Sequence, residues 1–283
     1  MYSNKIGVIV DSFRLDIKEG VKKAKEVGAD GIQIYAVSGK MDPDNLSSKE
    51  RKELLAYIKA SGLVVSALCG DMGGGFVNRE DNASKIEKSK RIMDLAVELE
   101  SKVVTTHIGV IPEDENHPTF KILQEACEEL GNYADNVGAY FAIETGPEKS
   151  ATLKKFLDSL KSNGVRVNLD PANLVMVIGD DPVEAVYNLK DYIVHTHAKD
   201  GVMYKPLNPE HFYHGSGDYD FVKWEEYFCE MPLGKGTVDF KAYIKALNDI
   251  GYHGFLTIER EVGENPAKDI KDAVDFLKDI INF

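Results

Sequence analysis

Residues 140–144 read Tyr-Phe-Ala-Ile-Glu, a short apolar run that ends on an acid. Similar runs end on an acid in Val-Arg-Val-Asn-Leu-Asp (165–170) and Phe-Leu-Thr-Ile-Glu (255–259), and on a histidine in Tyr-Ile-Val-His-Thr-His (192–197). Short runs rich in β-branched and aromatic residues predict strands buried on both faces, as in a parallel sheet. Each run therefore predicts a strand with a potential metal ligand at its carboxyl end.

Further apolar runs alternate with amphipathic stretches along the rest of the chain, which is typical of repeated βα units. The expected strands are Ile6–Val10, Gly31–Tyr35, Val64–Leu68, Val103–His107, Tyr140–Glu144, Val165–Asp170, Ile193–His197 and Phe255–Glu259. The expected helices are Ile17–Val27, Ser48–Ser61, Asn82–Leu99, Thr119–Val137, Ala151–Lys161, Pro182–Leu189, Phe240–Ile250 and Ala267–Ile280. Eight such units predict an α/β fold, a (β/α)₈ TIM barrel with residues 1–283 in a single domain.

One long connection, from Ala198 to about Val238, breaks the alternation and is crowded with Gly, Pro, His and aromatic residues. Irregular connections of this length are uncommon unless they are functional. We therefore expect a loop that reaches over the site. Local packing is the default for its aromatic residues, but five side chains could close a pocket or meet a partner subunit: His211, Phe212, Tyr213, His214 and Trp224.

The composition limits which binding partners and which cellular compartment are expected for this protein. The 47 acidic and 34 basic residues give a formal charge of −13, which argues against a nucleic-acid partner. No apolar stretch is long enough to span a membrane, and the first residues show no signal-peptide pattern. The three cysteines are widely spaced, as expected of free thiols. We expect a cytoplasmic protein without a membrane partner, and a homo-oligomer stays open.

Glu144, Asp170, His197 and Glu259 should meet on one rim, because barrel active sites lie at the carboxyl ends of the strands. The first two spacings, 170 − 144 = 26 and 197 − 170 = 27, match one βα repeat each. Any one of these residues alone could simply be a polar group at the end of a strand that is hydrogen-bonded to a loop. Together, three carboxylates and one imidazole predict a site for one divalent cation, with Mn²⁺ expected and Mg²⁺, Co²⁺ or Zn²⁺ as alternatives.

Such a site suits a small hydroxylated substrate. A cation would lower the pKa of a bound hydroxyl and stabilise an enediolate. Glu144 and Glu259 could then serve both as ligands and as the catalytic acid and base. Attack from opposite faces of one carbon gives epimerisation, whereas proton transfer between adjacent carbons gives aldose–ketose isomerisation. Both outcomes stay open.

Five motifs carry a resemblance to a known family. They are Ile143-Glu144-Thr145-Gly146, Leu169-Asp170-Pro171-Ala172-Asn173, His195-Thr196-His197-Ala198-Lys199-Asp200, Pro232-Leu233-Gly234-Lys235-Gly236 and Leu256-Thr257-Ile258-Glu259-Arg260-Glu261. With these, nearly the whole chain resembles the xylose-isomerase-like barrels, which include sugar phosphate isomerases and epimerases, ketose 3-epimerases, inosose isomerases and apurinic endonucleases. The resemblance implies a Glu/Asp/His/Glu metal site with the first and last Glu as the catalytic pair.

Two departures concern the substrate. Ketose 3-epimerases commonly carry a His three residues after the metal-binding Asp and an Arg about six residues past the ligand His, where this chain has Asn173 and Met203. We expect Lys199 to supply the missing donor. The substrate-binding residues predicted from these positions and from the strand ends are His107, Glu148, Asn173 and Lys199. A rim His held by backbone groups and a helix-start acid favoured by the helix dipole are the alternatives for His107 and Glu148.

The expected function is isomerisation or epimerisation of a sugar, keto-sugar or inositol derivative, with a small carbohydrate as the partner. One alternative is a lyase or deglycosylase of 3-keto-glycosides, because enolisation beside a ketone also primes β-elimination. Another is a carbohydrate-binding barrel without catalysis. The nuclease branch matches at His107, but its further ligands are missing at Asn173, Phe228 and Glu230, and the acidic charge does not suit DNA.

Overall fold

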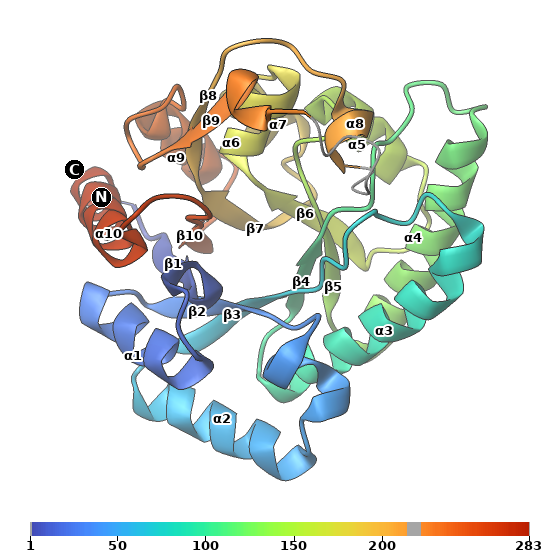
Figure 1. The fold of residues 1–283 in the computed structure, drawn as a ribbon. Coiled ribbons are helices and arrows are strands. Elements are labelled where there is room, and N and C mark those ends of the chain that lie inside the picture. Colours follow the sequence, from blue (N-terminus) through green and yellow to red (C-terminus); the bar gives the residue numbers. More distant parts are fainter. Residues whose placement is uncertain (1, 214–221, 283) are drawn as a thin grey trace.

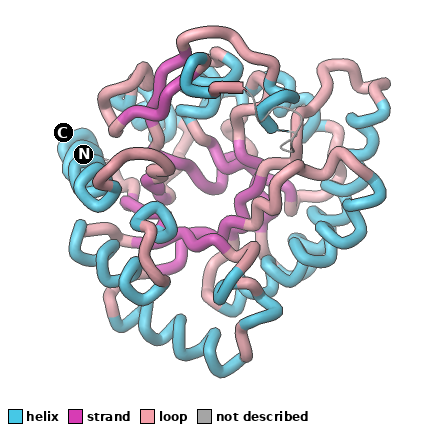
Figure 2. Tube along the Cα trace, in the orientation of Figure 1, coloured by secondary structure: helices cyan, strands magenta, loops and turns pink. Residues whose placement is uncertain are grey.

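The computed structural model describes residues 2–213 and 222–282 and shows a closed barrel of eight parallel strands. The strands form the inner ring of Figure 2 and follow the order β1-β10-β7-β6-β5-β4-β3-β2 around the barrel. Their bounds are β1 Lys5–Ile9, β2 Gly31–Tyr35, β3 Val64–Cys69, β4 Val103–Thr106, β5 Tyr140–Glu144, β6 Val165–Leu169, β7 Ile193–Ala198 and β10 Phe255–Ile258. Pairing of β1 with β10 closes the ring. The predicted TIM barrel is confirmed.

Eight main helices surround the strands (Figure 1) and bury their apolar faces against them. They are α1 Ile17–Val27, α2 Ser48–Ala60, α3 Arg79–Glu98, α4 Pro118–Val137, α5 Ser150–Asp158, α7 Pro182–Asn188, α9 Phe240–Asp249 and α10 Pro266–Ile281. Local signals set their ends. Ser47 and Glu50 form a capping box at the start of α2, and Gly28 ends α1 in the left-handed region at φ 91°.

Two further findings concern the composition. Cys69, Cys127 and Cys229 are free thiols, as predicted. Across residues 2–213 and 222–282, no helix is both long enough and apolar enough to cross a bilayer.

The strand ends differ slightly from the prediction, and the difference matters for the site. Strand β4 ends at Thr106, so His107 begins the following loop. Strand β6 ends at Leu169, and Asp170 is the N-cap of a short helix, α6 Pro171–Asn173, that continues as a π-helix over Leu174–Ile178. The Asp170 carboxylate accepts the Asn173 N–H at 2.9 Å. The metal-ligand candidate therefore also caps a helix, which fixes its rotamer.

The connection after β7 is more regular than expected, so the prediction of an irregular loop was wrong. Two short strands, β8 Asp200–Met203 and β9 Phe228–Met231, pair as an antiparallel ribbon with Asp200 opposite Met231. A short helix, α8 Pro209–Tyr213, precedes the segment that is not described, which includes His214. In Figure 1 the ribbon lies at the upper left and α8 at the upper right, next to α5. Phe212 of α8 contacts Phe228 of β9 with ring centroids 5.2 Å apart.

Asp200 ties the base of the ribbon to the chain that leaves it. Its carboxylate accepts backbone N–H groups of Gly201, Gly234, Gly236 and Val238. A Cβ on Gly236 would collide with this carboxylate and with the Gly201 nitrogen, so only glycine allows the approach. The ribbon therefore starts from a fixed base immediately after Lys199.

Candidate active site

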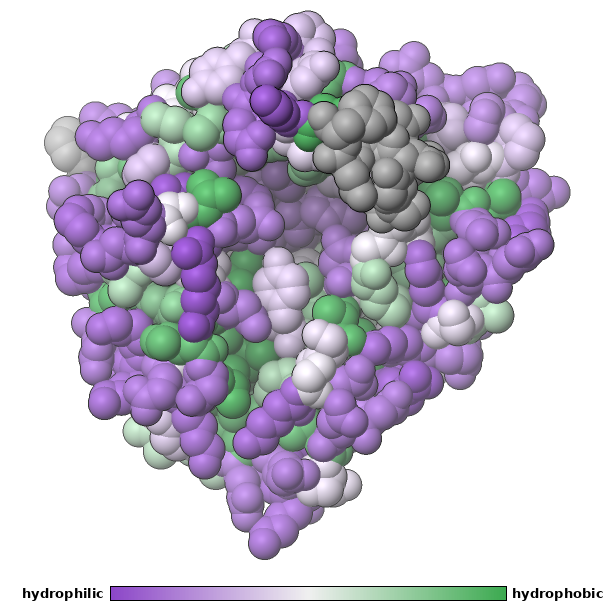
Figure 3. Space-filling view, viewed as in Figure 1, coloured by the Kyte–Doolittle hydropathy of each residue, from purple (hydrophilic) through white to green (hydrophobic). Residues whose placement is uncertain are grey.

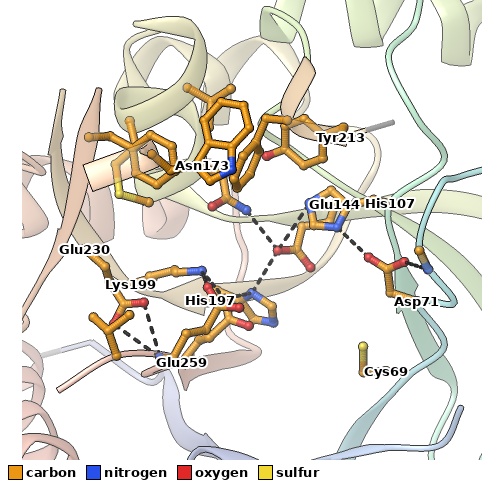
Figure 4. Close-up of a pocket in the computed structure, with 18 of the residues that line it drawn as sticks. Cys69, Asp71, His107, Glu144, Asn173, His197, Lys199, Tyr213, Glu230 and Glu259 are labelled. Carbon is orange, nitrogen blue, oxygen red and sulfur yellow. Dashed lines mark hydrogen bonds and ion pairs between the residues drawn. The ribbon is translucent and has the colours of Figure 1, made fainter. Parts of the chain in front are cut away.

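Glu144, Asp170, His197 and Glu259 converge at the carboxyl end of the barrel, and this set is named the ligand cluster below. Each offers one ligand atom, and these atoms lie within 4.8 Å of one another. His197 Nδ1 is central, at 3.3 Å from Asp170 Oδ2, 3.5 Å from Glu144 Oε1 and 3.4 Å from Glu259 Oε2. Figure 4 shows His197 with Glu144 and Glu259. All four side chains are buried.

This geometry fits a divalent cation. Two ligand atoms bound about 2.1 Å from the same ion lie about 3.0 Å apart at octahedral right angles and about 3.4 Å apart at tetrahedral angles. The three distances from His197 Nδ1 fall close to these values. The donor set of oxygen atoms and one imidazole nitrogen is the one that Mn²⁺, Mg²⁺, Co²⁺ and Zn²⁺ share. The ligand cluster could therefore hold one such ion.

A chain of buried hydrogen bonds beneath the cluster fixes the tautomer of His197. Gln33 on β2 donates its Nε2 to Thr105 Oγ1 at 3.0 Å, so its Oε1 faces His197 Nε2 at 3.1 Å as an acceptor. With Gln33 Oε1 as the acceptor, the proton of the neutral ring lies on His197 Nε2, which is also 3.2 Å from Asn168 Nδ2. In that neutral form Nδ1 presents a lone pair to the three carboxylates, as a metal ligand requires.

Asn168 on β6 orients the carboxylate of Glu144 through a second set of buried hydrogen bonds. It donates Nδ2 to Glu144 Oε2 at 3.0 Å, while its Oδ1 lies 2.8 Å from His195 Nδ1. Thr257 Oγ1 lies 2.9 Å from His195 Nε2 and completes the chain. Burial, together with the neighbouring His197, lowers the pKa of His195 well below its usual value. His195 is therefore a neutral, buried ring that orients Asn168.

Replacing Gln33 with leucine should weaken Mn²⁺ binding by about ten- to hundredfold, the usual cost of losing a group that orients a metal ligand. Leucine leaves His197 Nε2 without an acceptor and frees the ring to rotate or change tautomer. Isothermal titration calorimetry measures the change. Ser66→Ala, which removes a buried strand hydroxyl bonded to Ile32 O, is the control. Equal affinities of the Gln33→Leu and Ser66→Ala proteins would contradict the role given to Gln33.

Two positively charged side chains, His197 and Lys199, balance the negative charge of the carboxylates in the ligand cluster. Burial lowers the pKa of His197, but Glu144 and Glu259 outweigh it and raise that pKa well above its usual value. Burial also raises the pKa of Asp170. For Glu259, Lys199 and His197 outweigh the effect of burial and hold the pKa below its usual range. A metal ion at the ligand cluster would therefore compete with a proton for His197 Nδ1.

Three of the four predicted substrate-binding residues line a common cavity with Glu144, His197 and Glu259 of the ligand cluster: His107, Asn173 and Lys199. Asp170 is buried and does not line the cavity itself. Asn173 donates Nδ2 to Glu144 Oε1 at 3.1 Å. Lys199 Nζ lies 3.0 Å from Glu259 Oε2 and also pairs with Glu261.

His107 Nδ1 lies 2.8 Å from Asp71 Oδ2, and its Nε2 lies 3.7 Å from Glu144 Oε1. Burial lowers the pKa of His107, but Glu144 and Asp71 raise it to about 9. The fourth predicted residue, Glu148, is buried, does not line the cavity and accepts the Ile111 N–H. Burial raises the pKa of Glu148 to about 8.

The cavity measures about 660 Å³, and a hollow opens at the centre of the face shown in Figure 3. That volume lies within the range of about 300–1,000 Å³ typical of small-molecule sites. Side chains that the sequence did not single out also line it, among them Gln33, Tyr35 and Cys69. Gln33 could have been noticed, because a polar residue in the middle of an apolar strand needs a buried partner.

Unpartnered polar atoms gather at this cavity. Six buried side-chain atoms of the described residues lack a hydrogen bond, and two of them, His107 Nε2 and Tyr213 Oη, belong to cavity residues. A third, Glu259 Oε2, also lies at the cavity, but it forms ion pairs with Lys199 and His197. Buried polar groups are nearly always bonded, so unpaired atoms around one cavity indicate a missing partner. A ligand with several hydroxyl groups would satisfy them.

Comparison with known proteins agrees with this picture. The family model described as xylose isomerase-like TIM barrel matches residues 21–280. The chain is 26% identical over 228 residues to an uncharacterized protein of Methanocaldococcus jannaschii, covering 75% of this chain and 66% of that one. It is 29% identical over 150 residues to an inosose dehydratase of Lacticaseibacillus casei, covering 52% and 48%. The chain thus spans about half to two thirds of the curated relatives it matches.

Solved structures extend the likeness over the whole chain. A xylose isomerase domain protein from Planctomyces limnophilus superimposes with a TM-score of 0.79 at 25% identity, covering 100% of this chain and 99% of that one. Other structures of the same fold, each under 25% identical, are sugar epimerases and a dehydratase. Since the family model matches nearly all of the sequence, this chain belongs to the xylose isomerase-like TIM barrel family.

Proposed function

We propose that this protein is a divalent-metal-dependent isomerase or epimerase that acts on a sugar, keto-sugar or inositol derivative through an enediolate. The observation that carries the proposal is the ligand cluster, which opens into a cavity with unpartnered polar atoms. The sugar epimerases among the structural neighbours support it as an analogy of fold.

Glu144 and Glu259 are the proposed acid and base. Strands β6 and β7 lie between β5, which carries Glu144, and β10, which Glu259 follows, so the two carboxylates approach the cavity from different sides. Amide groups of Asn168 and Asn173 hold both oxygens of Glu144. When bound, a divalent cation would lower the pKa of a substrate hydroxyl and stabilise the developing negative charge.

Lys199 is the proposed donor beside Glu259. Its ammonium group is buried and pairs with Glu259, so it stays charged and keeps Glu259 ionised. A substrate oxygen that approaches Glu259 would also come within reach of Lys199. His107, whose Nε2 has no partner, is the proposed donor on the opposite side, next to Glu144.

A lyase or deglycosylase acting on 3-keto-glycosides is a second candidate. Removing the proton beside the ketone prepares the neighbouring bond for β-elimination, so the same residues could serve. The size of the cavity favours this candidate, because water occupies about 30 Å³ in the liquid and the space would hold roughly twice the non-hydrogen atoms of a hexose.

Exchange of substrate protons with deuterated water tests the proposal. The Mn²⁺-loaded protein should incorporate deuterium beside the carbonyl of a ketohexose, an inosose or methyl 3-keto-β-D-glucoside, as followed by NMR. Chelation should stop the exchange, and Glu259→Gln should slow it by about 10²–10⁴-fold, as expected for an acid–base residue. The products then distinguish an epimer or isomer from a released aglycone.

Glu264→Gln is the matched control, because Glu264 is exposed on the loop that follows Glu259 and lies outside the cavity. It should exchange at the rate of the unaltered protein. Metal binding without exchange on any of these three substrates would contradict the enzyme proposal and favour a non-catalytic carbohydrate-binding barrel.

A further inference from the structure

The cavity has two unlike halves. One half is polar and is lined by Glu144, His197 and Glu259 of the ligand cluster together with Lys199, His107 and Asp71. The other is apolar and is built by Met176 and Val177 of the π-helix with four aromatic side chains: Phe212, Tyr213, Trp224 and Phe228. These four residues are named the aromatic wall below. In Figure 4, Tyr213 lies on the opposite side of the cavity from Lys199 and Glu259.

The rings of the aromatic wall support one another. The Phe212 centroid lies 5.0 Å from Tyr213, 5.1 Å from Trp224 and 5.2 Å from Phe228, with each pair edge to face. Such contacts are favourable arrangements of aromatic rings and hold them in set orientations. Met176 and Val177 are buried against the same cluster. The aromatic wall is therefore a preformed apolar surface that faces the cavity.

Charge argues against a phosphate in this space. The cavity is lined by six carboxylates: Asp71, Glu144, Glu225, Glu230, Glu259 and Glu261. Among the described residues that line it, Lys199 is the only lysine or arginine, and it already pairs with Glu259 and Glu261. A phosphorylated sugar would bring two further negative charges, whereas the described cationic side chains of the lining already pair with carboxylates: Lys199 with Glu259 and Glu261, and His107 with Asp71. An uncharged substrate suits the cavity better.

Size and shape complete the argument. A sugar ring reaching the ligand cluster would use about half of the 660 Å³, which leaves the apolar half for a second group. A flat apolar group would bury against the aromatic wall, with gains from surface burial and ring contacts. A bare monosaccharide would leave the rings facing water.

We propose that the substrate is an uncharged sugar carrying a flat apolar group, that is, an aryl glycoside or its keto derivative. The sugar ring lies at the ligand cluster and the aryl group lies against the aromatic wall. This inference rests on the proposed function for the sugar end, and it assigns a subsite of its own to Phe212, Tyr213, Trp224 and Phe228.

The only tryptophan of the chain, Trp224, gives a direct probe because it belongs to the aromatic wall. The Mn²⁺-loaded protein is titrated with phenyl β-D-glucoside and with methyl β-D-glucoside while tryptophan fluorescence is recorded. Phenyl glucoside should change the emission and bind at least about tenfold more tightly than methyl glucoside, which corresponds to about 1.4 kcal/mol. Equal affinities, or no binding of phenyl glucoside up to its solubility, would overturn the proposal.

Substitutions in the aromatic wall test whether its rings, and not a general change in the protein, cause the preference for phenyl glucoside. Phe228→Leu and Phe212→Leu should each reduce the preference for phenyl over methyl glucoside at least threefold, as measured by calorimetry. Tyr204→Leu is the control, because Tyr204 is an exposed aromatic of the same connection outside the cavity, and its variant should keep the full preference. Unchanged preference in both phenylalanine variants, with circular dichroism of the native fold, would refute the subsite.

The two proposals fail in different ways. Proton exchange with equal affinities for the two glucosides would leave the proposed function standing and remove the aryl subsite. A preference for phenyl glucoside without proton exchange would keep the subsite and refute the enzyme.

Discussion

Asp170→Asn is expected to abolish stoichiometric Mn²⁺ binding while the barrel stays folded. The change removes one charged ligand from the cluster and places an uncharged amide 3.3 Å from His197 Nδ1. An asparagine can still accept the Asn173 N–H, so the helix cap at α6 is preserved. Affinity should fall by more than the ten- to hundredfold typical of losing a group behind the ligands. Isothermal titration calorimetry and bound metal after dialysis measure the loss.

The chain contains a matched control in Asp181. Like Asp170, it is followed by a proline and caps a helix, and its carboxylate accepts the N–H groups of Val183 and Glu184. Asp181 is exposed, does not line the cavity and is not part of the ligand cluster. Asp181→Asn should bind Mn²⁺ with normal affinity. Full binding by Asp170→Asn would rule out the proposed metal site.

Lys199→Met is expected to destabilise the metal-free protein strongly and the Mn²⁺-loaded protein much less. Lys199 is 5% exposed and pairs with the buried carboxylate of Glu259. Removing one partner of a buried ion pair leaves an uncompensated charge, which usually costs about 3–5 kcal/mol. A bound divalent cation would supply the missing positive charge. Chemical denaturation with a chelator and with excess Mn²⁺ measures both free energies of unfolding.

Lys205→Met is the comparison for this experiment. Lys205 pairs with Glu226 at 3.3 Å on the surface of the same connection, where both side chains are 57% exposed. An exposed pair contributes about 0–1 kcal/mol, so this variant should change little and should not depend on metal. A small, metal-independent change for Lys199→Met would show that Glu259 does not rely on Lys199 for its charge balance.

The sequence predicted the barrel because its strands and helices repeat two clear periodicities. Runs such as residues 140–143 are apolar throughout, and the intervening stretches bury one face. The same alignment of strand ends predicted the ligand cluster, since parallel strands bring their carboxyl ends to one rim. The positions of Glu144, Asp170, His197 and Glu259 followed from that rule alone.

The hydrogen-bonded layer below the cluster could not be predicted in the same way. Gln33, Asn168, His195 and Thr257 come from four strands, and their side chains satisfy one another only inside the closed barrel. Each looks like an isolated polar exception in an apolar run. Which nitrogen of His197 faces the carboxylates depends on this layer, so sequence alone does not determine it.

The ribbon and the aromatic wall could not be predicted from the sequence for another reason. Strands β8 and β9 have four residues each and pair with each other across a long stretch of the connection. So short a strand shows no measurable alternation, and no turn of fixed length joins the two. The aromatic residues of the connection were visible as a composition, but their arrangement depends on this pairing.

The hydrogen bonds that the Asp200 carboxylate accepts have a consequence for how proteins with this fold could acquire new substrates. Because Asp200 holds the base of the ribbon to Gly234 and Gly236, the chain beyond it is anchored independently of its own sequence. The four residues of the aromatic wall lie between these anchor points in the chain, while His197 and Lys199 precede them. One contiguous insert could thus be exchanged for another between the same two anchor points, and the barrel would acquire a new specificity without altering its chemistry.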